Sequence, residues 1–546
     1  MSINVSKKMI CHVPFKKMGW KPAIFTGLII AILFTVFCSI QLTAQGMYYD
    51  ELHQATGSFY KDKAPLCPLV IRGIPVMNTS YSGAIKTNIY GIYLKYSKCN
   101  FSIISWRLLG IFFVVAGVIL FCVIGGSDLS IGGLLLFLVL LLTDITVVLT
   151  TRHDWGPTAL ALLFRLVFIA TWIHGETGNY TSKGNTFLLG SIVGISIFEK
   201  LSSFVLVVPL ILILLLSHGR RSLRHGLTCI AGLILGVMPL ILVNVATLSR
   251  KGCLISVSNV AAQNNFSLYG FVKYIFEYLS LGGGAILRHG ILGTTGTTSF
   301  YADGFLIGTL LLLIAVIAVR YSKRNKFLRM SGIMLLCYGT VGISLYFLPQ
   351  ITWVHHWIIG TPFQYAAISF AFIGLLDQNG DIQLGRKFLR ITLVCIIGCL
   401  LISRLFGMIS VGKSLLQCDA SIKWDHSLTE IGYFAARQSN DSFFIAADWG
   451  VGTQIYCLTN GQTDLVHELF WNYKGLADIE RVIGITRKNN FYVVVKKPES
   501  GVNHHVTSRI MQDVELLAGW KEVPIEKEMA GLKAIQIRKF QKVVRD

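Results

Sequence analysis

Charged residues are scarce in this chain: they make up 14% of the 546 residues, against 53% of hydrophobic type. The mean hydropathy is +0.61, whereas ordinary soluble domains carry about 25% charged residues. This composition excludes a purely soluble enzyme. Acidic residues are fewer than basic ones: the chain has 28 Asp and Glu and 49 Lys and Arg, which gives a net charge of +21. In a soluble protein that excess would suggest nucleic acid. Here the basic residues mark membrane topology and the C-terminal tail, so we expect no nucleic-acid partner.

The chain also lacks paired cysteines. Its 12 Cys are scattered without a Cys-x-x-Cys pair, so their spacing indicates neither a zinc site nor a dense disulfide framework. Cys67 with Cys99, and Cys418 with Cys457, could still form disulfides outside the membrane. There is no internal repeat at solenoid spacing and no low-complexity tract.

Long apolar runs are abundant, and about 20 apolar residues suffice to cross a bilayer as a helix. The first run, 22–44, follows a basic stretch and is about twice as long as the apolar core of a cleavable signal. We predict that it is retained, with the N-terminus cytoplasmic. Ten further runs bring the predicted total to about eleven: 102–124, 130–150, 157–174, 185–199, 201–216, 227–247, 303–320, 330–348, 358–376 and 389–410.

The basic loops agree with this count. Loops 217–226, 320–330 and 377–390 are rich in Arg and Lys, and all fall on the cytoplasmic side, as the positive-inside rule requires. The outer segments are then 45–101, 150–156, 248–302, 349–357 and the tail. The tail, 411–546, has short apolar stretches separated by Gly, Asn and Asp, which predicts a soluble α/β domain. The predicted fold is mostly α: a polytopic membrane helical bundle over 1–410 with a small extracytoplasmic α/β domain over 411–546.

The most informative residues follow the first apolar run directly. Asp50 and Glu51 lie at the outer membrane boundary, in Gly46-Met47-Tyr48-Tyr49-Asp50-Glu51-Leu52-His53. A lipid phosphate would lie at the same depth, where partial desolvation raises the pKa of a carboxylate toward general-base use. The alternative is a solvated acidic helix end. The loop continues into an aromatic segment, Tyr81 to Tyr93, whose tyrosines and Lys86 fit a helix lying in the interface. The presence of this aromatic segment favours a catalytic role of Asp50 and Glu51 over a solvated helix end.

Other outer turns concentrate polar residues. In the turn at 150–156, Arg152, His153 and Asp154 could grip a phosphate and a sugar hydroxyl together, or could be snorkelling charges at a helix end. Glu199 and Lys200 lie at the junction of two short apolar runs. A contact between them would stabilise the turn, and the alternative is phosphate binding by the lysine.

Two further outer segments carry cationic candidates. Adjacent His355 and His356 could bind a phosphate or a divalent metal, although no third metal ligand is in view. Arg288, after a glycine run in the 248–302 segment, is a further candidate for anion binding.

Two charges lie deeper in the predicted membrane part. Asp144 and Arg165 stand about ten residues either side of the outer turn, so in an antiparallel helix pair they reach a similar depth of roughly 15 Å. An unpaired charge there would be costly. We therefore expect Asp144 and Arg165 to form an ion pair with a structural role.

These motifs resemble those of the GT-C type membrane glycosyltransferases, especially the protein O-mannosyltransferase and aminoarabinose-transferase group with its family-39-like bacterial members. Tyr49-Asp50-Glu51 looks like the Asp-Glu pair of the family's first outer loop, and Tyr81 to Tyr93 resembles the juxtamembrane helix that follows. Lys200 is placed like the family's lysine near the end of a short membrane helix. The segment Arg152 to Pro157 lies where the family has an Arg-Tyr…Asp-Pro stretch, but with different spacing. The resemblance covers essentially the whole membrane part.

The resemblance implies an inverting transfer of a sugar from a polyprenyl-phosphate donor to an acceptor hydroxyl at the outer face of the membrane. Asp50 would be the general base, and Glu51 would orient Asp50 or the acceptor. Several side chains are expected to bind substrate or to neutralise the departing phosphate: Tyr81, Lys86, Arg152, His153, Asp154, Lys200, Arg288, His355 and His356. Phosphate is a good leaving group, so no metal or other cofactor is required. The resemblance also implies a bacterial inner membrane with the tail in the periplasm.

Two other classes of function remain open at the level of sequence. A transporter or flippase of a lipid-linked or anionic solute would also place charges in membrane helices, but here the candidates gather at one face of the bilayer. A membrane scaffold whose outer domain binds a partner leaves Asp50 and Glu51 unexplained. The sequence identifies neither the sugar nor the acceptor, which could be a protein, lipid A, another glycolipid or a polysaccharide.

Overall fold

A computed structural model describes residues 17–62, 67–178, 182–218, 222–258, 266–294, 297–323, 325–349, 352–376, 384–438, 440–501 and 504–543. The basic residues before position 17, together with Arg220, Arg221 and Arg324, lie outside these ranges. Several of the positions on which the predicted orientation rests are among them.

Within the described ranges, seven helices are long and apolar enough to cross a membrane. They are α1 (Trp20–Cys38), α4 (Ile103–Ile124), α7 (Thr158–Thr177), α10 (Ser222–Lys251), α14 (Thr297–Tyr321), α15 (Lys326–Tyr346) and α18 (Leu384–Leu416). A bent pair, α5 (Ile131–Leu142) and α6 (Ile145–His153), is the eighth candidate. Three shorter apolar helical segments complete the set: α8 (Lys183–Glu199), η3 (Leu201–Leu206) with α9 (Val207–His218), and α17 (Thr361–Leu376). All eleven predicted apolar runs are therefore helical.

The bend between α5 and α6 has a local cause. Asp144 stands at the N-cap of α6, and its carboxylate accepts a hydrogen bond of 3.0 Å from the backbone N–H of Val147. Aspartate is among the strongest N-cap residues, so it starts a new helix here rather than continuing α5. The two helices meet at 60°. The predicted run 130–150 is therefore a broken segment, and α6 is directed at the outer loops.

Helices α8 and α10 pack through glycine. A Cβ on Gly190 would lie 2.0 Å from the carbonyl oxygen of Cys229, and one on Gly194 would lie 2.4 Å from that of Leu233. Gly232 and Gly236 of α10 are equally close to the α8 backbone. Small residues four apart allow this approach, which is a common basis of helix association in lipid.

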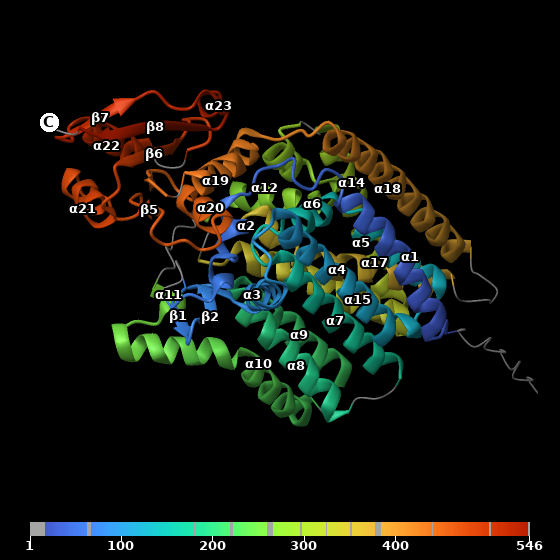
Figure 1. Ribbon diagram of the computed structural model, residues 1–546. Helices are drawn as coiled ribbons and strands as arrows, with labels where there is room; N and C mark the ends of the chain where they lie inside the picture. The colour runs from blue at the N-terminus through green and yellow to red at the C-terminus, as the bar shows by residue number, and fades with distance from the viewer. Residues whose placement is uncertain are drawn as a thin grey trace, which may run out of the picture.

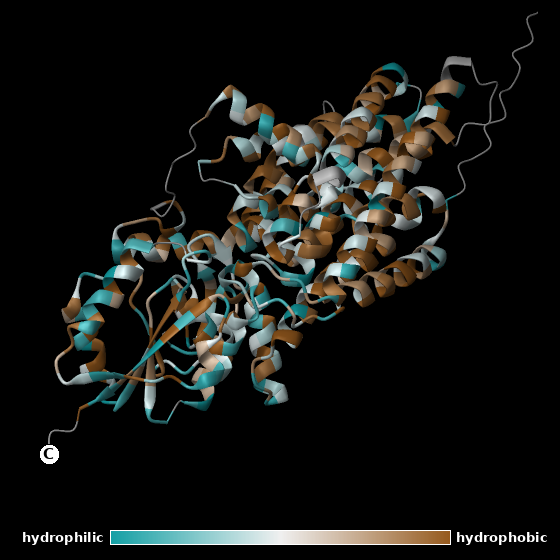
Figure 2. Ribbon diagram, turned by 90° about the horizontal axis from the view of Figure 1, so that it is seen from above, coloured by the Kyte–Doolittle hydropathy of each residue, from teal (hydrophilic) through white to brown (hydrophobic). Residues whose placement is uncertain are grey.

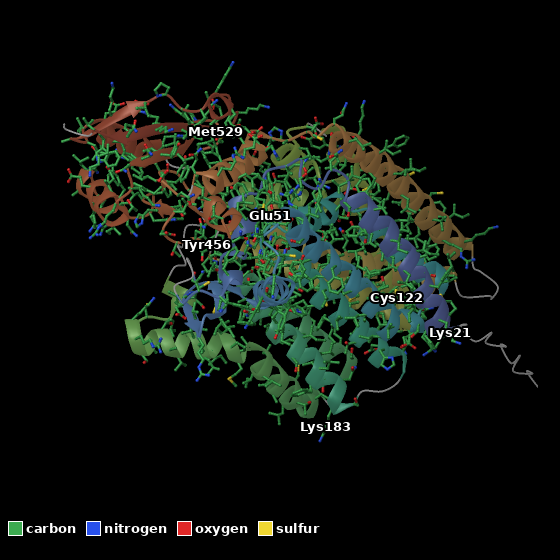
Figure 3. The ribbon with its side chains drawn as sticks, in the orientation of Figure 1. Lys21, Glu51, Cys122, Lys183, Tyr456 and Met529 are labelled. Atoms are coloured by element: carbon green, nitrogen blue, oxygen red, sulfur yellow. The ribbon has the colours of Figure 1, made fainter. Side chains whose placement is uncertain are left out.

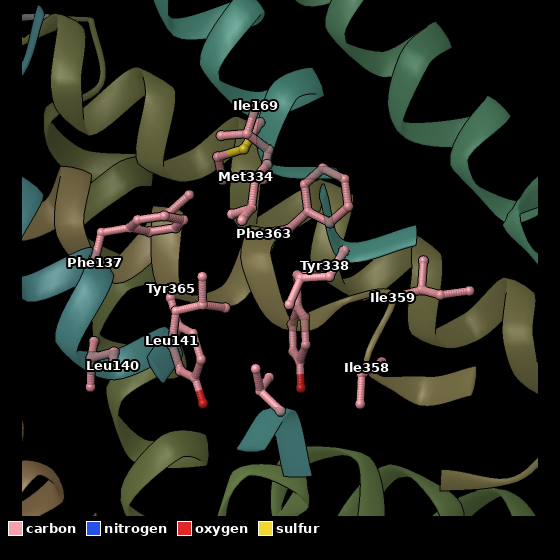
Figure 4. Close-up of a cluster of buried hydrophobic side chains, with 14 of the residues drawn as sticks. Phe137, Leu140, Leu141, Ile169, Met334, Tyr338, Ile358, Ile359, Phe363 and Tyr365 are labelled. Atoms are coloured by element: carbon pink, nitrogen blue, oxygen red, sulfur yellow. The ribbon is translucent and has the colours of Figure 1, made fainter. Parts of the chain in front are cut away.

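The helical part and the C-terminal part differ visibly in polarity and place. Figure 1 shows the helices from α1 to α18 packed side by side, with the C-terminal sheet at one end of the molecule. In Figure 2 the helices are largely hydrophobic, whereas the C-terminal elements carry many hydrophilic residues. A buried apolar cluster, which includes Phe137, Met334 and Phe363, lies between α5, α7, α15 and α17 (Figure 4). The mostly helical fold predicted from the sequence is confirmed.

The segments predicted to lie outside the membrane, and the connection between α4 and α5, carry short elements. The first contains α2 (Tyr49–His53), η1 (Thr56–Phe59), a small antiparallel sheet and α3 (Ile85–Ser97). The sheet strands are β1 (Leu69–Ile71), β2 (Ile74–Thr79) and β3 (Ser82–Gly83), in that order. Other short helices are η2 (Gly126–Asp128), α11 (Ile255–Ser258), α12 (Leu268–Leu279), η5 (Leu281–Gly283), α13 (Ala285–Leu287), the π-helix η6 (Arg288–Leu292) and α16 (Val354–Trp357).

The C-terminal part is a five-stranded sheet with helices. Its strands are β4 (Ser442–Ala446), β5 (Val466–Glu468), β6 (Asn490–Lys496), β7 (Trp520–Val523) and β8 (Ile535–Lys542). The order is β5-β4-β6-β8-β7; β4 is parallel to β5 and β6, and β8 is antiparallel to β6 and β7. The helices are η7 (Ile422–Trp424), α19 (Ser427–Arg437), α20 (Val451–Leu458), α21 (Leu476–Thr486), α22 (His504–Glu515) and α23 (Lys527–Ala530). Apolar clusters cover both faces of β4 and β6.

The predicted ion pair between Asp144 and Arg165 is wrong. Asp144 accepts a hydrogen bond of 2.6 Å from the hydroxyl of Tyr365 and lies 3.7 Å from Arg404. Arg165 instead donates to backbone carbonyls of its own helix, those of Ala161 and Thr158. Asp144 and Arg165 do not meet, although the sequence predicts a similar depth for both, because the bend at Asp144 directs its carboxylate toward α17 and α18.

Arg404 is the centre of the buried network that Asp144 joins. Its guanidinium forms an ion pair of 2.7 Å with Asp303 and donates to the Tyr365 hydroxyl at 2.9 Å and to the Gly282 carbonyl at 2.5 Å. The network therefore ties α6, α14, α17 and α18 together, and it supplies the partner that the depth of Asp144 requires.

The cysteines proposed for disulfides are unpaired. Cys67, Cys99, Cys418 and Cys457 are all free thiols. Cys457 is buried inside α20, whereas Cys418 is exposed.

Candidate active site

A cavity of about 260 Å³ opens among the segments that the sequence predicts to lie outside the membrane. Small-molecule pockets usually exceed roughly 300 Å³, so this cavity is of a size for one head group rather than a whole lipid-linked substrate. It brings together α2, the β2–β3 turn, the α6–α7 turn, the end of α8 and α16. The lining residues are Asp50, His53, Gln54, Thr79, Tyr81, Ser82, Gly156, Pro157, Lys200, Trp353, His355 and His356.

Asp50 projects into the cavity from the first turn of α2. Its Oδ2 accepts a hydrogen bond of 2.8 Å from the indole N–H of Trp155. Burial raises the pKa of Asp50, while the Trp155 hydrogen bond and the charges of Lys200 and Lys496 act against this rise. A carboxylate with a raised pKa is a stronger base once ionised, which is the property that general-base catalysis uses.

Lys200 lines the same cavity at the point where α8 ends. Its backbone is extended and pairs with Ser82 as an isolated β-bridge, which fixes the position of the lysine. The Nζ atom is buried and has no hydrogen-bond partner among the described residues. Burial lowers the pKa of Lys200 to about 7. An ammonium held without a partner inside a cavity is suited to an anionic ligand.

Gly156 makes room for this lysine. Its φ is +66°, and a Cβ at this position would lie 3.2 Å from Lys200 Nζ. A side chain would therefore strain the turn and displace the ammonium.

The histidines of the cavity lie in surroundings that disfavour the charged imidazolium. Burial lowers the pKa of His355 and His356 well below the usual value, and the Lys200 charge lowers both further. Burial also lowers the pKa of His53 to about 4. Burial thus favours the neutral imidazole, which can both donate and accept hydrogen bonds.

Aromatic side chains surround Asp50. Tyr48 stacks on Trp424 at 5.0 Å between ring centroids, and Trp155 stacks on His355 at 5.0 Å. Trp449 packs on Tyr49 at 4.3 Å. Because Trp424 and Trp449 belong to the tail, the C-terminal part forms one wall beside the α2 helix. Figure 3 shows Glu51 and Tyr456 where these two parts meet.

Glu51 lies next to Asp50 but faces away from the cavity. It is fully buried and makes two hydrogen bonds, of 2.7 and 2.8 Å, with the guanidinium of Arg107. Arg107 also donates to the carbonyls of Leu42, Gln45 and Gly46. The structure therefore places Glu51 in the support of α2 rather than among the cavity residues.

Four more of the predicted residues lie beneath the site. Lys86 and Asp154 form a fully buried ion pair of 2.5 Å, with the lysine 3.8 Å from the ring centroid of Trp106. Arg152 donates to the carbonyls of Cys38 and Gln41, and His153 hydrogen-bonds to the carbonyl of Leu149. The Arg152 contacts fix the α6–α7 turn against the end of α1, and the ion pair of Lys86 and Asp154 fixes it against α3.

Arg288 and Glu199 do not line the cavity. Arg288 donates to the hydroxyl of Ser410 in α18 at 2.8 Å. Glu199 accepts from the backbone N–H of Ile85 at 3.2 Å, and it forms no ion pair with Lys200 among the described residues. The suggested turn-stabilising contact between Glu199 and Lys200 is therefore wrong. Of the predicted site residues, the cavity holds Asp50, Tyr81, Lys200, His355 and His356.

Sequence reasoning missed Gln54, His53, Trp155 and Lys496. Gln54 lies four residues after Asp50, a spacing that places two side chains on the same helix face, and this signal was available. Trp155 was within the recognised outer turn. Lys496 ends strand β6, and no local pattern connects it with Asp50. The described residues contain no group of three or more His, Cys, Asp or Glu placed to hold a metal ion.

Comparison with known proteins identifies the fold. No family model matches the sequence, and no curated protein matches it. Among solved structures, ArnT from Cupriavidus metallidurans bound to undecaprenyl phosphate matches with a TM-score of 0.57 and 9% identity, over 94% of this chain and 97% of that chain. The apo state of the same ArnT gives a TM-score of 0.58 with the same identity and coverage. Arabinofuranosyltransferase AftD from Mycobacteria matches with 11% identity and a TM-score of 0.43, over 95% of this chain and 40% of that chain.

The chain therefore shares the fold of ArnT, which is a GT-C membrane glycosyltransferase, as the resemblance implied. At 9% identity the likeness to ArnT establishes the fold alone.

Proposed function

We propose that this chain is a membrane glycosyltransferase that moves a sugar from a polyprenyl-phosphate donor to an acceptor hydroxyl, with inversion at the anomeric carbon. The observation that carries this proposal is one cavity that holds a carboxylate of raised pKa, Asp50, together with a buried lysine, Lys200, whose Nζ has no hydrogen-bond partner among the described residues. The fold is shared with ArnT, whose structure contains undecaprenyl phosphate.

The two side chains match the two charges that change in the reaction. Asp50 takes the proton from the acceptor hydroxyl as its oxygen attacks the anomeric carbon. The bond from that carbon to the phosphate oxygen breaks, and the electron pair leaves with the lipid phosphate. Lys200 neutralises the departing phosphate, and the imidazoles of His355 and His356 provide neutral hydrogen bonds. The residues themselves account for this chemistry without a metal.

The topology that fits this function places the cavity at the outer face of the membrane. Residues 1–410 form the membrane glycosyltransferase domain, and 411–546 form an extracytoplasmic domain that covers one side of α2. We assign the protein to a bacterial inner membrane with a cytoplasmic N-terminus and a periplasmic C-terminal domain. A glycan, lipid or protein hydroxyl would be the acceptor.

The test is the binding of undecaprenyl phosphate to purified protein in detergent. Lys200→Met should weaken binding about tenfold or more, because a hydrogen bond to a charged group contributes about 1.5–3 kcal/mol. Lys413→Met is the matched control. Lys413 lines a separate, largely apolar cavity of about 800 Å³ between α1, α5 and α18, and its loss should leave the affinity unchanged. An unchanged affinity of Lys200→Met, or a loss in Lys413→Met instead, would place the phosphate elsewhere.

A further inference from the structure

Gln54 carries a buried amide for which the described part of the chain provides no hydrogen-bond partner. Its side chain is 3% exposed, and neither Nε2 nor Oε1 has a hydrogen-bond partner among the described residues. Leaving a buried polar group unpaired costs about 1–3 kcal/mol, and buried amides almost always have partners. Gln54 also lines the cavity that contains Asp50 and Lys200. A group so placed points to a ligand that supplies the missing partner.

The backbone of Gln54 is held firmly. Its carbonyl accepts a hydrogen bond of 2.5 Å from the hydroxyl of Thr87, and that hydroxyl accepts one of 2.5 Å from the Nδ2 of Asn78. Asn78 in turn donates to the carbonyl of Gly83 at 3.1 Å. Strands β2 and β3 and helix α3 therefore hold the backbone at Gln54. Because Gln54 follows Asp50 by four residues, the two side chains share one face of the helix.

We propose that Gln54 is a specificity-determining residue that hydrogen-bonds hydroxyl groups of the donor's sugar ring, an inference that rests on the proposed function. An amide offers both N–H donors and a carbonyl acceptor, and neighbouring sugar hydroxyls both donate and accept. A phosphate only accepts, and the Lys200 ammonium only donates. In this arrangement Lys200 contacts the phosphate of the donor and Gln54 contacts the sugar of the donor. Asp50 contacts the hydroxyl of the acceptor.

The experiment compares Gln54→Met with the wild type and with Gln45→Met. Gln45 is the matched control because it is a fully buried glutamine of the same outer segment whose amide is satisfied by Arg152, His153 and the carbonyl of Asp419. The probes are undecaprenyl phosphate and undecaprenyl phosphates linked to glucose, mannose, galactose and arabinose. Affinity and melting temperature are measured for each purified protein in detergent.

The wild type should bind at least one sugar-linked lipid more tightly than undecaprenyl phosphate. Gln54→Met should lose about tenfold in affinity for that lipid and retain the wild-type affinity for undecaprenyl phosphate. It should melt no lower than the wild type, because the Gln54 side chain makes no hydrogen bond to the residues that the structure describes. Gln45→Met should melt lower and keep the preference for the sugar-linked lipid.

Three results would overturn the inference: a lower melting temperature for Gln54→Met, an unchanged preference for the sugar in that variant, or a wild type that binds none of the sugar-linked lipids more tightly than undecaprenyl phosphate. If the wild type binds no polyprenyl lipid at all, the proposed function itself fails. The affinity for undecaprenyl phosphate distinguishes that failure from the others.

Discussion

The buried pair of Glu51 and Arg107 gives the sharpest prediction about how the site is supported. Arg107 extends from α4 and uses its guanidinium on both oxygens of Glu51 and on the carbonyls of Leu42, Gln45 and Gly46. These contacts connect the chain leaving α1 to the helix that carries Asp50. Replacing Arg107 by Met removes all of them and leaves the Glu51 carboxylate buried without a partner.

The expected loss of stability in Arg107→Met follows from the burial of the Glu51–Arg107 pair. Both side chains are fully buried, and removing one partner of such a pair costs about 3–5 kcal/mol because the remaining charge is uncompensated. In the double variant Arg107→Met/Glu51→Met no charge is left behind, although three carbonyls still lose their donor. The double variant should therefore recover a large part of the loss, and the coupling between the two positions should reach about 1–3 kcal/mol.

The assay is reversible unfolding in detergent micelles for the wild type, the two single variants and the double variant. Sugar transfer should fall in Arg107→Met, because α2 no longer holds Asp50 in place. An Arg107→Met variant within about 0.5 kcal/mol of the wild type, or a double variant less stable than either single one, would refute this account of Glu51.

Three further predictions concern the cavity and its frame. Transfer should follow a bell-shaped pH profile: it falls at low pH as Asp50, whose pKa burial raises, becomes protonated, and it falls above about pH 7 as Lys200 loses its proton. Lys200→Arg should shift the alkaline limb of this pH profile to higher pH. An unchanged alkaline limb would refute the assignment of that limb to Lys200. Gly156→Ala should weaken undecaprenyl phosphate binding, because its φ of +66° costs a side chain roughly 1–2 kcal/mol and the Cβ would crowd Lys200; wild-type affinity would contradict the role of this turn. Arg404→Met should lower the free energy of unfolding by about 3–5 kcal/mol, because it leaves the Asp303 carboxylate buried without its cationic partner. A thermal unfolding curve that does not shift would contradict this role of Arg404.

The membrane part could be predicted from the sequence because its signals are local. Apolar length alone located all eleven helical runs, since a backbone in lipid must satisfy its own hydrogen bonds. Even so, the bend at Asp144 was missed, although aspartate inside an apolar run is also an N-cap signal. That bend is the reason why Asp144 contacts Tyr365 and Arg404 rather than Arg165.

The site was harder to predict because burial decides the role of a charge. Asp50 and Glu51 are adjacent in sequence, yet one lines the cavity and the other is neutralised by Arg107, which is 56 residues away. Likewise, Lys86 and Asp154 neutralise each other across 68 residues, whereas Lys200 has no such partner in the part of the chain that the structure describes. Such long-range pairings leave no pattern in a single sequence.

The most direct test of the central claim is mass spectrometry of the lipid that co-purifies with the wild type and with Asp50→Asn. The substitution removes the base but keeps the shape of the side chain and an acceptor for the Trp155 N–H. If Asp50 is the base, Asp50→Asn carries out no transfer and retains a polyprenyl-phosphate sugar, whereas the wild type holds the spent polyprenyl phosphate. Normal turnover by Asp50→Asn, or the absence of any polyprenyl lipid from both proteins while other native lipids are retained, would contradict it.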